Sequence, residues 1–350
     1  MSQTLDRPPP AVADERLAQK SLVARLMGRP EIGALVGAIV IFILFFIVAP
    51  PFRDPASLAT VLYQSSLYGI PAVGVALLMI GGEFDLSTGV AVTTAALVAS
   101  ITAYQLSVNV WVGVAVSLVV ALAIGALNGY LLVKTGLPSF LVTLATFFML
   151  TGLNLAVTKI ISGGVATQDI SNIDGFDSAA AIFASEFSIG GVGIRITLVY
   201  WILFVLIATW VLLRTHIGNW IFAVGGSSPS ARAVGVPVNK VKIGLFMTVA
   251  FTTWFTGTHI LFEYNTVQSG QGVGNEFLYI IAAVVGGCLL TGGYGSAIGA
   301  GIGAFIFGMT EQGIVLAGWE ADWFKFFLGA MLLFACLLNA YVRKRAETQK

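Results

Sequence analysis

Charged residues are scarce in this chain of 350 residues. Asp, Glu, Lys and Arg make up only 10% of it, against roughly 25% in an ordinary soluble domain. Hydrophobic residues make up 57%, and the mean hydropathy is +0.91. So few charges cannot cover so much apolar surface in water, and the composition therefore predicts a chain whose solvent is lipid. It excludes a soluble enzyme, and a net charge of +1 excludes a nucleic-acid binder that relies on a basic surface.

Cysteine and histidine are equally rare, with two of each in the sequence. Cys288 and Cys336 both lie in apolar runs, where free cysteine packs as a small hydrophobic side chain. Two cysteines and two histidines do not make a zinc site. The sequence has no GxxxxGK[ST] loop for holding ATP phosphates. We therefore expect no metal, no cofactor and no enzymatic activity of the chain's own.

Ten apolar stretches are long enough, or nearly so, to cross a bilayer, which takes about 20 helical residues. They cover residues 32–49, 57–80, 90–107, 110–133, 139–158, 196–213, 243–264, 275–290, 297–317 and 323–342. Glycines break the chain near 81–90 and 275–296, so nine or eleven spans also fit the pattern. We predict one all-α integral membrane domain over residues 31–342.

Basic residues are divided unevenly between the connections. With ten spans and a cytosolic N-terminus, 14 of the 18 Lys and Arg residues fall inside and four outside, as the positive-inside rule requires. We therefore predict that both termini are cytosolic, with a disordered tail over 1–30 and a short tail over 343–350. The long hydrophilic connections are 159–195 outside and 214–242 inside. The acidic outer connection either touches a partner protein or is simply hydrated.

A short capped helix is predicted within the inner connection. Ser228 can serve as its N-cap and Pro229 as its first residue, while Gly235 can take the left-handed position beyond its end and Pro237 prevents continuation. Two interpretations remain open from these residues alone. The helix is either a well-capped surface connector or a rigid docking helix, attached at both ends to spans that it could move.

Several motifs, taken in their order along the chain, resemble a known family. They are GGEFDLSTG at 81–89, NGYL at 128–131, PSFLVTL at 138–144, and RTHIG and ARAVGVPVNKVK within 214–242. They are similar to the motifs of ABC importer permeases of the ribose/xylose/galactose type, and the similarity runs from about residue 58 to 340. It implies a vitamin-B12-importer-like (type II) fold with about ten spans, in the bacterial inner membrane.

The resemblance also implies partners and roles. The partners would be a second permease subunit, a cytosolic ABC ATPase and a periplasmic sugar-binding protein, and the cargo a pentose, a hexose or a related polyol. The helix at 229–235 would be the coupling helix that fits a groove on the ATPase. Arg232 would be its polar contact, with Ser228, Pro229 and Gly235 holding its geometry.

Polar side chains within the spans are candidates for a translocation path, because a charge near the bilayer centre costs about 2.5–3.5 kcal/mol and needs a partner or water. The candidates are Gln64, Asp85, Asn128, Asn154, Glu263 and Glu311. Each can instead fasten helices together, and Asp85 with Ser87 can cap a broken helix. A neutral sugar needs scattered hydrogen-bonding groups rather than a fixed charge.

Two other classes of protein compete with this interpretation. In an ion-coupled secondary transporter, Asp85, Glu263 or Glu311 would be the coupling carboxylate. Such a transporter does not require the capped cytosolic helix. A membrane-embedded enzyme would need a cluster of acids, bases or metal ligands, and the sequence offers no such cluster.

Overall fold

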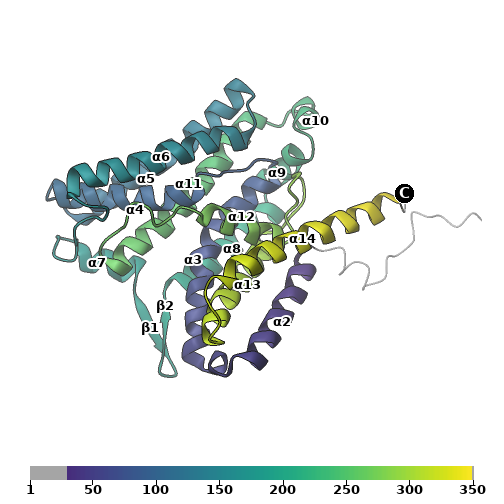
Figure 1. The fold of residues 1–350 in the computed structure, drawn as a ribbon. Coiled ribbons are helices and arrows are strands. Elements are labelled where there is room, and N and C mark those ends of the chain that lie inside the picture. Colours follow the sequence, from purple (N-terminus) through teal and green to yellow (C-terminus); the bar gives the residue numbers. More distant parts are fainter. Residues whose placement is uncertain (1–29, 349–350) are drawn as a thin grey trace, which may run out of the picture.

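The computed structural model describes residues 30–348, and within them the chain is helical apart from one small sheet (Figure 1). The predicted tail over 1–30 lies, except for Pro30, outside the described residues. The elements are α2 (Pro30–Val48), the 3₁₀ helix η2 (Pro50–Arg53), α3 (Pro55–Ile80), α4 (Thr88–Gln105), α5 (Val110–Thr135), α6 (Ser139–Ser162), α7 (Phe176–Phe183), β1 (Glu186–Ile189), β2 (Val192–Arg195), α8 (Thr197–Arg214), α9 (His216–Gly226), α10 (Ser228–Ala233), α11 (Val238–Tyr264), α12 (Asn275–Val285), α13 (Ala297–Leu316) and α14 (Trp323–Thr348).

Among the described residues, seven helices are long and apolar enough to cross a membrane, namely α2, α3, α5, α6, α8, α11 and α13. They confirm the prediction of an integral membrane protein and match seven of the ten predicted spans. The other three correspond to α4, which is rich in threonine, to α12, which is short, and to α14, in which the apolar run Trp323–Leu337 is described. Neighbouring helices bury most of α4, so its outer surface need not be apolar. A total of ten spans stays a prediction.

Glycines allow the helices of the core to approach closely. A Cβ at Gly125 of α5 would lie 2.7 Å from the carbonyl oxygen of Phe246 in α11. A Cβ at Gly299 of α13 would lie 1.9 Å from the carbonyl oxygen of Gly286, just after α12. Only the absence of a side chain permits these distances, as at small-residue interfaces in membranes. Gly125 with Gly129, and Gly299 with Gly303, have the four-residue spacing that is typical of such interfaces.

The small sheet is a departure from the all-α prediction. Strands β1 and β2 pair antiparallel, with Glu186 opposite Arg195. The turn between them is Gly190-Gly191, whose φ angles of 59° and 83° suit the two-residue hairpin turn that follows strand twist. The hairpin lies in the connection 159–195, so the sequence placed the connection but missed its structure.

Segments far apart in the chain gather at two ends of the molecule. One end holds the break at 81–87, α10 and the loop 286–296, with the amide of Gly293 donating to the carbonyl of Ile80 at 2.8 Å. The other end holds η2, the hairpin and the loop 265–274, where the amide of Thr167 donates to the carbonyl of Val267 at 3.0 Å. Figure 1 shows α10 and the hairpin at opposite ends. With ten spans and a cytosolic N-terminus, the sequence predicts that the first group lies on the cytosolic side and the second group on the periplasmic side.

Candidate functional site

Helix α10 projects from one end of the molecule, and its first turn differs from the prediction. The N-cap is Ser227, whose hydroxyl oxygen accepts from the amide of Ser230 at 3.4 Å. Ser228 is the first helical residue and its hydroxyl donates back to the carbonyl of Val224 at 2.9 Å. The predicted N-cap at Ser228 is therefore wrong by one residue, and Pro229 takes the second helical position. Two adjacent serines suit the cap equally, and the contact with α9 decides between them.

The end of α10 has the predicted glycine geometry. Gly235 has a φ of 89°, and its amide donates to the carbonyl of Arg232 at 3.0 Å. The Arg232 side chain is exposed and donates to the Asn239 side chain at 3.2 Å. Beside it, Val234 is 79% exposed. A rigid short helix thus presents a cation and an apolar side chain to its surroundings, which suits contact with a protein surface.

The end of α9, which leads into α10, takes part in a cluster of close backbone contacts. We name this cluster the glycine junction, and it consists of Gly82, Gly225, Gly226, Gly292 and Gly293. A Cβ at Gly225 would lie 1.8 Å from the carbonyl oxygen of Ile80. A Cβ at Gly292 would lie 2.6 Å from the Cα of Gly82. The junction therefore joins the α9–α10 corner to the end of α3 and to the loop after α12 without intervening side chains.

An ion pair lies next to the glycine junction. Lys242, in the first turns of α11, pairs with Glu83, which directly follows Gly82. Both side chains are largely buried, with 18% and 11% of their areas exposed. The pair fixes the start of α11 to the break after α3. The sequence accounted for Lys242 by topology alone and did not predict this contact.

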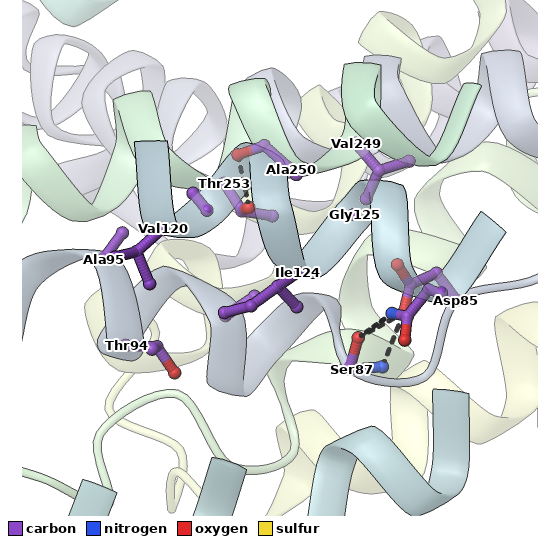
Figure 2. Close-up of a pocket in the computed structure, with 13 residues that line it drawn as sticks. Asp85, Ser87, Thr94, Ala95, Val120, Ile124, Gly125, Val249, Ala250 and Thr253 are labelled. Carbon is purple, nitrogen blue, oxygen red and sulfur yellow. Dashed lines mark hydrogen bonds between the residues drawn. The ribbon is translucent and has the colours of Figure 1, made fainter. Parts of the chain in front are cut away.

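Asp85 lies buried in the segment that leads into α4 (Figure 2). Its carboxylate oxygen Oδ1 accepts from the amide of Ser87 at 2.8 Å and from the Ser87 hydroxyl at 2.6 Å. The carboxyl group thus lies just before the N-terminal end of α4. The cavity beside it measures about 10 Å³, which is about the space of one water molecule. Asp85 therefore closes a turn before α4, whereas the N-cap of α4 is Ser87, which makes no side-chain cap bond, so the predicted cap is not formed. The small cavity leaves no open passage at Asp85.

Asn128 and Asn154 join α4, α5 and α6. Asn128 accepts from the hydroxyl of Thr146 at 2.6 Å and donates to the hydroxyl of Ser87 at 3.3 Å. Asn154 accepts from the hydroxyl of Thr94 at 3.1 Å. Both asparagines are buried. These contacts are the interhelical fastening that the sequence left open as an alternative to a path.

We expect Asn154→Leu to weaken the fold without slowing transport. Interhelical hydrogen bonds in membranes contribute about 0.6 kcal/mol on average and up to about 1.7, so the free energy of unfolding should fall by an amount in that range. Unfolding in a mixed detergent titration measures this change, and uptake per folded molecule measures transport. Lost uptake with an unchanged unfolding transition would instead place Asn154 in the path.

The remaining candidates are engaged elsewhere. The Gln64 amide donates to the Tyr68 hydroxyl at 3.0 Å, and that hydroxyl donates to the Glu311 carboxylate at 2.8 Å. Glu263 pairs with Arg195 at 2.8 Å, at the base of the hairpin. The six predicted path residues therefore occupy four places: Asp85 with Asn128, Gln64 with Glu311, Asn154 alone, and Glu263 alone.

A polar cavity of about 180 Å³ lies between α3, α4, α11 and α12. Of the predicted path residues, only Gln64 lines it. The sequence missed the other polar lining residues, which are Tyr68, Thr93, Thr256, Tyr264, Gln271, Asn275 and Tyr279. The spacing in the sequence could have indicated some of these residues. Gln64 and Tyr68 are four residues apart, as are Asn275 and Tyr279, so each pair lies on one face of a helix.

Ionisable side chains do not gather into a metal site. Within residues 30–348, no three His, Cys, Asp or Glu side chains lie close enough to hold a metal ion. In the hydrophilic connection 159–195, the hydroxyl and amide of Ser171 hold the pKa of Asp169 below its ordinary value. The amide contact measures 2.7 Å. This exposed carboxylate stabilises its own turn.

Comparison with known proteins places the chain in a family of transport permeases. Residues 57–336 match the family described as branched-chain amino acid transport system / permease component. The chain belongs to this family, so it is a membrane transport permease of the bacterial inner membrane and not an enzyme. The resemblance to monosaccharide ABC importer permeases is confirmed by the relatives below. No solved structure matches the chain.

The curated relatives cover nearly the whole chain. The ribose import permease protein of Escherichia coli K12 is 30% identical over 309 residues, which are 87% of this chain and 92% of that protein. The fructose import permease protein of Rhizobium meliloti is 27% identical over 338 residues, 95% and 91% of the two chains. The autoinducer 2 import system permease protein of an Enterobacter species is 28% identical over 323 residues, 91% and 89%.

Proposed function

We propose that the chain is the transmembrane subunit of an ABC importer that carries a monosaccharide, either a pentose, a hexose or a related polyol, while a separate subunit hydrolyses ATP. The observation that supports it best is α10. This helix of six residues and its C-cap expose Arg232 and Val234. Gly225, in the helix before it, packs on the backbone at the end of α3 and in the loop after α12. A helix held in this way can transmit a movement of a bound ATPase to the end of α3 and to the loop after α12.

The assembly follows from the same proposal. The connection 214–242 is the cytosolic coupling loop, 159–195 is periplasmic, and both termini are cytosolic. Two permease subunits with a type II fold, about ten spans each, pair in the membrane with the ATPase below and a periplasmic sugar-binding protein above. Family membership supports the ATPase and the binding protein, and the ribose and fructose named for two relatives support the sugar.

Ion-coupled transport has no comparable support. Its candidate carboxylates are all engaged: Asp85 by Ser87, Glu263 by Arg195 and Glu311 by Tyr68. An ion-coupling carboxylate must exchange these partners for an ion during each cycle. Uptake by the chain alone, driven by an ion gradient, would favour that class instead.

Uptake tests the coupling role of α10. Arg232→Glu reverses the exposed charge, and Gly235→Pro forces φ to about −65° at a position that needs a left-handed backbone. We expect both variants to insert normally and to lose ATP-driven uptake. The matched control is Gly235→Asn, because asparagine tolerates this backbone and nothing lies within 4 Å of the position.

The measurement is uptake of labelled sugar into vesicles that contain the complete importer, with the ATPase retained on the purified permease as second readout. If Arg232→Glu loses uptake and ATPase binding while Gly235→Asn keeps uptake and ATPase binding, the result supports α10 as the coupling helix. Normal uptake in Arg232→Glu and Gly235→Pro would remove α10 from the mechanism.

A further inference from the structure

The polar cavity between α3, α4, α11 and α12 has the size of a small solute. Its volume of about 180 Å³ is more than ten times the space of about 10–15 Å³ that one water molecule needs. Its inner wall includes the buried side chains of Thr93, Thr256 and Tyr279. Tyr264, which is 55% exposed, and the exposed Gln271 lie at its mouth. The cavity therefore leads from the surface at the loop 265–274 into the helical core.

The chemistry of the lining is polar but uncharged. Amide, hydroxyl and phenol groups come from all four helices, and these groups both donate and accept hydrogen bonds. Leu67, Val92 and Ile260 add apolar surface between them. Within the described residues, no Asp, Glu, Lys or Arg side chain lines the cavity. A polyhydroxylated ring has this mixture of hydroxyl edges and C–H faces.

Two carboxylates that neighbour lining residues are engaged in contacts of their own and do not line the cavity. Glu311 accepts from the Tyr68 hydroxyl at 2.8 Å, so the phenol and not the carboxylate borders the cavity. Glu276 accepts from the amide of Gly274 at 3.1 Å, at the start of its own helix. An amino acid is a zwitterion, and burying its two charges without charged partners is costly. The lining thus favours neutral solutes over amino acids.

We infer that this cavity is a binding site, within the permease itself, for one neutral polyhydroxylated molecule of monosaccharide size, and that it rejects amino acids. The inference rests on the proposed function and deepens it, because it assigns the substrate class to residues of this chain and not only to an external binding protein. It also separates this chain from the substrate in the description of its family.

Cysteine protection tests the site in the full chain. Thr93→Cys is made together with Cys336→Ser, because Cys336 is partly exposed whereas Cys288 is buried, and the purified permease is labelled with methyl methanethiosulfonate. D-ribose, D-fructose and L-leucine are the probes. A sugar at about ten times its Kd should slow labelling about tenfold, and leucine should not slow it. Thr266→Cys, in the loop 265–274 at the mouth of the cavity but outside its lining, is the control whose labelling should stay constant.

A second variant covers the case in which the cysteine disturbs the wall. Thr93→Val keeps the shape and removes one hydroxyl, so sugar affinity measured by calorimetry on the otherwise unchanged chain should fall about two- to tenfold. Protection by sugar, or this loss of affinity, supports the site.

The failures of the two proposals are distinguishable. If the complete importer takes up ribose or fructose but that sugar neither protects Thr93→Cys nor binds the unchanged chain, the cavity is not a binding site and the importer function stands. If leucine protects as well as the sugars, the assignment to neutral solutes is overturned. If the complete importer takes up leucine and neither sugar, both proposals fall.

Discussion

Replacing Gly225 by alanine should abolish sugar uptake while leaving the chain inserted in the membrane. A Cβ at this position would lie 1.8 Å from the carbonyl oxygen of Ile80 and 2.6 Å from the amide nitrogen of Gly293. Both neighbours are backbone atoms, so no side chain can turn away to relieve the clash. Overpacking of this kind costs about 1–3 kcal/mol or more, and the α9–α10 corner must separate from the end of α3.

Gly226→Ala is the matched control, because nothing lies within 4 Å of a Cβ at the next residue. Both glycines stand in the last turn of α9, so the substitutions change helix propensity alike. ATP-driven uptake into vesicles and the rate of ATP hydrolysis should be normal in Gly226→Ala, whereas in Gly225→Ala uptake should be lost. Equal uptake by the two variants would show that the close contact has no part in transport.

Reversing the charge of Lys242 should have the second largest effect. Lys242→Glu places a carboxylate against Glu83 in a setting where both side chains are more than four-fifths buried. Breaking a buried pair by changing one partner costs about 3–5 kcal/mol, and repulsion adds to this. We expect a large fall in the free energy of unfolding and loss of uptake.

The double variant Glu83→Lys with Lys242→Glu restores an opposite-charge pair and should recover most of the lost stability. Lys240→Glu is a control of the same charge change on the same helix turn, where the lysine is exposed and a surface charge is worth about 0–1 kcal/mol. Thermal unfolding of the unchanged chain, the single variants Glu83→Lys and Lys242→Glu, and the double variant measures the coupling energy. A double variant no more stable than Lys242→Glu would show that the pair does not fix the start of α11.

Hydropathy predicted most of the fold because lipid-facing helices must be apolar along their length. Gly81-Gly82 and Gly286-Gly287 were recognised as breaks, and α3 and α12 end at them. Composition is a weaker predictor of membrane spans where a helix is surrounded by protein and not by lipid. Helix α4 is threonine-rich and mostly buried by its neighbours, so its apolarity says little about whether it spans. The hairpin was missed because four-residue strands carry little periodicity.

Local patterns predicted one part of the candidate site and could not predict the other. The cap residues of α10 are read from a few adjacent positions, and the error was one residue, at Ser227. The glycine junction joins Gly82, Gly225 and Gly292, which are more than sixty residues apart from one another. No local rule relates such positions. The polar cavity likewise draws its walls from four helices, and only Gln64 was selected in advance.

The contacts of the glycine junction that position α10 are made by backbone atoms, whereas the surface that α10 exposes is made by side chains. The glycine junction holds the root of α10 through main-chain atoms at Gly225 and Ile80, whereas the exposed side chains of Arg232 and Val234 take no part in it. In the proposed coupling role of α10, these side chains can differ between permeases to suit different ATPases while the backbone contacts of the glycine junction stay unchanged. Exchanging residues 228–236 between two such permeases should exchange the ATPases that they bind, while each permease keeps the solute that it transports.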